Sequence, residues 1–96
     1  MSDAPTEIRR DIFAGLDSLL LEVRGQVLRA EGLHAPINSA HEGYAVILEE
    51  LDELWDQVKL KRGDRDADAM RRELIQTAAM CLRTIRDVIA GSESPR

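Results

Sequence analysis

Apolar residues recur every three or four positions in three separate stretches of this chain, and that spacing decides its fold class. In the first stretch the repeat consists of Ile8, Ile12, Leu16, Leu19, Val23 and Val27. The second consists of Tyr44, Ile47, Leu48, Leu51, Leu54, Trp55 and Val58, and the third of Met70, Leu74, Ala78, Cys81, Leu82, Ile85 and Ile89. Such steps return to one face of an α-helix, whereas a half-buried strand alternates every second residue. The pattern therefore predicts an all-α protein with three long helices.

Capping and breaking residues divide the three stretches from one another. Gly32 is a plausible stop for the first stretch, and Pro36 opposes its continuation. Ser39 stands three residues before Glu42, the capping-box arrangement that begins a helix. Gly63 follows a basic run and is a typical helix stop, as is Gly91 near the end of the chain. We therefore predict helices over residues 5–31, 39–62 and 66–90 of a single domain spanning residues 1–96.

The length of the chain favours association with a second copy. A chain of 96 residues builds a core that gives only modest stability on its own. Helices this long bury more apolar surface when two chains share a four-helix-type bundle core. We therefore expect a homodimer or a higher homo-oligomer.

Charge and cysteine content exclude several classes of partner. The formal net charge of -5 argues against a nucleic-acid polymer, because phosphate backbones are bound by basic surfaces. No apolar run reaches the ~20 residues that span a bilayer, and no signal-peptide pattern opens the chain, so we expect no membrane partner. The single cysteine, Cys81, cannot form an internal disulfide and is best explained as a small core residue. The simplest location is the cytoplasm.

An acidic constellation on the second and third helices is the strongest candidate for a functional site. Glu50 and Glu53 lie three residues apart, so they project from nearly the same side of a helix. A short connection forces the next helix to pack antiparallel, which would bring Glu73 opposite them. Carboxylate oxygens are the ligands of Mg²⁺ or Mn²⁺, and helical bundles build metal sites from facing helices. The alternative is a solvated acidic face without a metal.

The segment Leu48–Leu54, followed by Glu73–Gln76, resembles the MazG-like all-α nucleoside triphosphate pyrophosphohydrolases. Their pattern is EExxE, a variable spacer and then ExxD, on two helices of a dimeric bundle. Glu49, Glu50 and Glu53 match the first half, and Glu73 matches the start of the second. The resemblance covers roughly residues 39–90. The last Asp of the pattern is Gln76 here, whose amide oxygen is able to ligate a cation but brings no charge.

The resemblance implies hydrolysis of a (deoxy)nucleoside triphosphate to monophosphate and pyrophosphate, a house-cleaning of nucleotide pools. Mg²⁺ (or Mn²⁺) would be held by Glu50, Glu53 and Glu73, with Gln76 as a neutral ligand or the holder of a bound water. Glu49 would act as general base. The departure at Gln76 leaves two alternatives open, a variant enzyme or a catalytically decayed helical dimer that acts as a protein-binding or structural module.

Further residues near the motif are candidates for substrate contacts. Lys59, Lys61 and Arg62 follow the second helix and are either phosphate-binding residues or helix-end charges. Gly43 lies one to two turns before Glu50, where a missing side chain leaves room either for substrate or for close helix packing. His41 flanks the connection where the base of a nucleotide would enter; the alternative is that it has no role beyond its place at the start of the helix.

Overall fold

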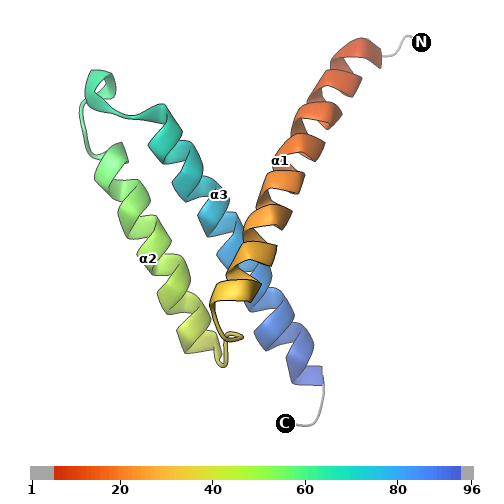
Figure 1. Cartoon of the computed structure of the whole chain (residues 1–96). Coiled ribbons are helices and arrows are strands. Elements are labelled where there is room, and N and C mark those ends of the chain that lie inside the picture. Colours follow the sequence, from red (N-terminus) through yellow and green to blue (C-terminus); the bar gives the residue numbers. More distant parts are fainter. Residues whose placement is uncertain (1–5, 94–96) are drawn as a thin grey trace.

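The structure, a computed structural model, describes residues 6–93 and contains three α-helices in that range. They are α1 (Thr6–Leu33), α2 (Ala40–Val58) and α3 (Ala67–Thr84), and no strand occurs among the described residues. The prediction of an all-α protein is therefore confirmed. Figure 1 shows α2 and α3 as an antiparallel hairpin, with the C-terminal part of α1 crossing α3 and its N-terminal part pointing away. The expected start of the first helix at residue 5 lies outside the described residues.

The two ends of α2 are set by side chains. At the start, the Ser39 hydroxyl accepts a hydrogen bond from the Glu42 backbone N–H at 3.0 Å, as the capping-box pattern predicts. The helix ends at Val58 rather than at residue 62, and a short 3-10 turn (Arg62–Asp64) follows it. The Arg65 guanidinium donates to the carbonyl oxygen of Val58 at 2.6 Å. Because this side chain satisfies a helix-end carbonyl, the chain leaves the helix before Gly63.

The end of α3 differs from the continuous helix expected up to residue 90. The α-helix begins after Asp66, whose carboxylate accepts from two backbone N–H groups of the first turn. After Thr84 it passes into a π-helical turn (Ile85–Ile89) and then a 3-10 turn (Ala90–Glu93). The Asp87 carboxylate in the π turn accepts a hydrogen bond from the Ile37 backbone N–H at 3.0 Å. This end of α3 therefore fixes the connection between α1 and α2.

The core is small and lies where α1 crosses the hairpin. It consists of Val23, Ala30, Ala79 and Met80, with Val27, Val46, Ile47, Ile75 and Ala78 packed against it. The same stripe of α1 continues towards the N-terminus as Phe13, Leu16 and Leu20, which are all exposed. They are exposed because this part of α1 diverges from the hairpin (Figure 1).

A second exposed apolar surface lies on the hairpin itself. On α2 it comprises Tyr44, Leu48, Leu51 and Trp55; it continues with Leu74 of α3 and with Ile85 and Ile89 of the π-helical turn that follows α3. At ~100° per residue, each set occupies one flank of its helix. The opposite flank of α2 faces α1, because Val46 and Glu50 line a cavity together with residues of α1. We call this exposed set the hairpin face; whether a second chain covers it stays a prediction.

None of the helices within residues 6–93 is long and apolar enough to cross a membrane.

Candidate metal centre

Three carboxylates converge between α2 and α3. Glu50 and Glu53 of α2 and Glu73 of α3 each offer one oxygen, and these oxygens lie within 4.8 Å of one another. The three-residue spacing aligns the first two on one side of α2, and the antiparallel hairpin brings the third to them. The structure thus brings together the three charged residues that the sequence predicts as metal ligands. We call them the carboxylate cluster.

The cluster holds more negative charge than its surroundings neutralise. Burial raises the pKa of Glu50 and that of Glu73, and a hydrogen bond with Glu73 raises the pKa of Glu53. The positive charge of Arg72 only partly opposes the rise in the pKa of Glu73. When all three carboxyls are ionised they have no proton to share, and the buried Oε2 atom of Glu73 then has no hydrogen-bond donor. A buried acceptor without a donor costs free energy, and a bound cation would remove that cost.

The donor set therefore fits a hard divalent cation. Mg²⁺ and Mn²⁺ are bound through carboxylate oxygens, with water or substrate oxygens in the remaining positions. Gln76 lies one turn after Glu73 on α3, and its side-chain Nε2 donates to the Oε1 atom of Gln26 on α1 at 2.6 Å. The carbonyl oxygen of Gln76 is the part of this amide that remains for a cation or its water.

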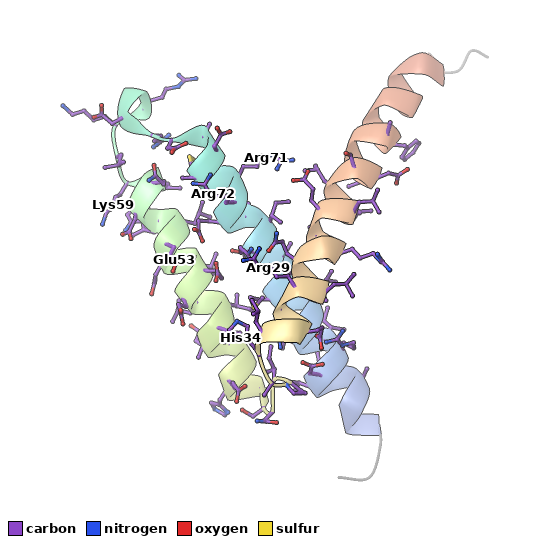
Figure 2. All side chains as sticks on the ribbon, in the orientation of Figure 1. Arg29, His34, Glu53, Lys59, Arg71 and Arg72 are labelled. Atoms are coloured by element: carbon purple, nitrogen blue, oxygen red, sulfur yellow. The ribbon has the colours of Figure 1, made fainter. Side chains whose placement is uncertain are left out.

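A cavity of about 480 Å³ opens beside Glu50, between α1 and the hairpin. Glu42 and Glu49 line it on the α2 side, and Arg29 and His34 line it on the α1 side. Figure 2 shows Arg29 of α1, and His34 just after the end of α1, near the crossing of the helices. Ala30, Ile37, Val46 and Met80 supply apolar lining. The volume falls within the ~300–1,000 Å³ range of small-molecule sites.

A second cavity of about 530 Å³ lies next to Glu73 and shares Gln26 and Gln76 with the first. Arg71 and Arg72 of α3 line it (Figure 2). Arg71 forms an ion pair with Glu22 at 2.5 Å, whereas Arg72 acts on Glu73 through its charge. A basic group therefore stands beside the carboxylate cluster, as the binding of phosphate oxygens requires.

The other predicted site residues lie elsewhere. Lys59, Lys61 and Arg62 are exposed around the end of α2 and line neither cavity. Lys59 pairs with Asp56 at 3.0 Å. His41 is exposed at the start of α2 and also lines neither cavity. Their roles in phosphate and substrate binding stay predictions.

Gly43 is buried at the contact between α2 and α3. A Cβ atom at this position would lie 2.5 Å from the Cγ2 atom of Thr84. This approach is too close for any side chain to be added without movement, so the geometry supports the packing alternative. A role of Gly43 in substrate binding stays a prediction.

Sequence reasoning named no residue of α1 as part of the site. Arg29 and His34 reach the first cavity, and Gln26 borders both cavities. The motif lies on α2 and α3 alone and carries no information about a helix that packs across them. One signal was available, since Gln26 is polar but adjoins the buried stripe of Val23 and Ala30.

A comparison of the chain with models of known families, with curated proteins and with solved structures found no match. The function is therefore inferred from the site.

Proposed function

We propose that this protein hydrolyses a (deoxy)nucleoside triphosphate to monophosphate and pyrophosphate in a divalent-metal-dependent reaction. The observation that carries the proposal is the carboxylate cluster with the unpartnered Oε2 atom of Glu73, next to a cavity of suitable size. The motif resemblance supplies the substrate class. The cellular role would be house-cleaning of nucleotide pools, which implies a cytoplasmic location.

Each residue of the site has a defined part in this proposal. Glu50, Glu53 and Glu73 hold Mg²⁺ or Mn²⁺, and Gln76 adds a neutral oxygen. When bound, the cation neutralises phosphate oxygens and lowers the pKa of a water molecule. Glu49 lines the first cavity directly beside Glu50, so it accepts the proton of the attacking water.

The charges around the two cavities support an orientation for the substrate. Arg72 is the basic residue next to Glu73, so the phosphates lie on this side of the cluster. The nucleoside then occupies the first cavity, between Arg29 and Glu42. Lys59, Lys61 and Arg62 remain the alternative contacts for the outer phosphates.

Pyrophosphate release from a panel of nucleoside triphosphates, with Mg²⁺ or Mn²⁺, tests the proposal. Glu53→Gln removes a cluster carboxylate and should abolish turnover, whereas Asp52→Asn removes an exposed neighbour outside the cluster and should leave turnover intact. Equal activity of wild type and Glu53→Gln would refute the site. If wild type hydrolyses no nucleotide, the protein-binding or structural module becomes the better explanation.

We also propose that two chains associate through the hairpin face. The accessible surface of the chain is 7282 Å², whereas a compact monomer of 10.8 kDa exposes about 5,500 Å². The hairpin face shares this excess of about 1,700 Å² per chain with the diverging part of α1. Obligate homodimers bury areas of this size, roughly 1,000–2,500 Å² on each partner. Two hairpins in contact would form a four-helix core.

Molar mass in solution tests this association. Light scattering after size exclusion should give twice the 10.8 kDa of one chain for wild type. Leu51→Lys, in the hairpin face, should give a monomer. Leu21→Lys changes an exposed leucine of α1 outside the hairpin face and serves as the control. A wild-type mass of one chain would contradict the proposed dimer without affecting the carboxylate cluster.

A further inference from the structure

Gln26 is a polar side chain at a position where α1 packs against α3. Its neighbours on the packed side of the helix are Val23, Val27 and Ala30, which are apolar and belong to the core or pack against it. Gln26 is partly buried, and its Oε1 atom accepts the 2.6 Å hydrogen bond from the Nε2 atom of Gln76. An apolar residue would pack here without leaving a polar group to satisfy, so the amide needs another explanation.

The Gln76 amide adopts one of its two possible orientations in this hydrogen bond. An unrestrained amide turns about its last bond and presents either its carbonyl oxygen or its NH₂ group in a given direction. In this structure Gln26 accepts from the Nε2 atom, so the NH₂ group points to α1 and the carbonyl oxygen points away from α1. No described group donates a hydrogen bond to that oxygen.

The position of Gln76 makes this orientation matter. Its side chain lines the first cavity together with Glu50 and the second together with Glu73, so it borders the carboxylate cluster. An NH₂ group turned towards a bound cation would repel it, whereas a carbonyl oxygen ligates it or accepts from its water.

We propose that Gln26 is a positioning residue that orients the carbonyl oxygen of Gln76 for the divalent cation. This inference rests on the proposed metal site and deepens it. It assigns to α1, which lies outside the motif, a part in building the site. Losing a hydrogen bond that orients a metal ligand typically lowers metal affinity by 10–100-fold. The Gln26–Gln76 hydrogen bond is of this kind.

The test is Mn²⁺ affinity, measured by titration calorimetry or by the paramagnetic signal of free Mn²⁺. Gln26→Met has a similar length but accepts no amide hydrogen bond, and it should weaken Mn²⁺ binding roughly tenfold. Gln26→Glu still accepts from the Nε2 atom, so it should bind Mn²⁺ at least as tightly as wild type. If Gln26→Met fails to fold, Gln26→Leu is a second variant that removes the hydrogen-bond acceptor.

A double-mutant cycle separates orientation from packing. In a Gln76→Leu background there is no amide to orient, so Gln26→Met should cause no further loss of Mn²⁺ affinity. An equal loss in both backgrounds, or unchanged affinity of Gln26→Met, would overturn the positioning role. In either case wild type still binds Mn²⁺ and the proposed function stands. If wild type itself binds no Mn²⁺, the proposed metal site fails, and the role of Gln26 fails with it.

Discussion

Replacing Glu73 by Gln should stabilise the metal-free protein, although it removes a proposed metal ligand. The substitution keeps the size of the side chain and supplies an amide N–H that donates to Glu50 or Glu53. It also removes one of three like charges whose oxygens lie within 4.8 Å of one another. The variant therefore exchanges repulsion for a hydrogen bond.

The size of this effect follows from the geometry. Two unit charges 4.8 Å apart repel by about 0.9 kcal/mol in water, and Glu73 takes part in two such pairs. Salt at about 0.1 M screens part of this repulsion, which leaves about 1 kcal/mol for these partly exposed groups. In a domain of this size, 1 kcal/mol corresponds to an increase in Tm of about 4–8 °C.

The gain in stability of Glu73→Gln over wild type should increase with pH. The pKa values of the three cluster carboxyls are raised in the folded protein. Groups of this kind bind protons more tightly in the folded state than in the unfolded state. Their contribution to the stability of wild type is therefore fully present below the ordinary glutamate pKa. Wild type loses that stability as the pH rises through the raised values. The advantage of Glu73→Gln should therefore be absent near pH 4 and full at neutral pH.

Thermal melts followed by circular dichroism, in a chelator and then in millimolar Mg²⁺ or Mn²⁺, measure both effects. Wild type should gain stability from the cation by mass action, and Glu73→Gln should gain much less. Asp52→Asn, an exposed acid outside the cluster, serves as the control and should respond to the cation like wild type. A lower Tm of Glu73→Gln in chelator at neutral pH, or an equal response to the cation, would refute the reasoning.

Four further predictions concern single residues. Arg83 is 3% exposed and donates to the Ala35 carbonyl oxygen at 3.0 Å, so Arg83→Met should lower the free energy of unfolding in urea by about 2–3 kcal/mol; a loss below ~0.5 kcal/mol would contradict this. Gly43→Ala should destabilise by about 1–3 kcal/mol because of the Thr84 contact, and Thr84→Ala should restore part of the loss. Gly15→Ala meets no atom within 4 Å and should instead stabilise slightly. Arg72→Ala should raise KM for the nucleotide more than Arg62→Ala, and the reverse order would favour phosphate contacts at the end of α2.

Local features of the chain were readable from its sequence because their causes lie within one helix turn. The repeat of apolar residues predicts the three helices, and Ser39 predicts the start of α2. The end of α2 was not predictable in this way, since the side chain that satisfies the Val58 carbonyl oxygen belongs to Arg65, beyond the helix. A helix-end pattern at Gly63 gives no information about such a contact.

The carboxylate cluster was predictable for a similar reason, because a three-residue spacing and an antiparallel hairpin define it. The Gln26–Gln76 hydrogen bond joins residues 50 positions apart, and the contact between Arg83 and Ala35 spans 48. Both depend on how α1 crosses the hairpin. No periodicity specifies that crossing, since the apolar stripe of α1 continues past the core to Phe13.

The residues of the hairpin face and those of the carboxylate cluster lie on different sides of α2. Leu48 and Leu51 belong to the hairpin face, whereas Glu50 lines the cavity between α2 and α1, and Glu53 follows it by about one turn on the same side of α2. Because these flanks differ, a second chain that covers the hairpin face leaves both cavities open to a substrate. A substitution that breaks the dimer should therefore act on stability first, while one in the cluster acts on cation binding first. The two proposals can thus be tested independently in the same short segment of α2.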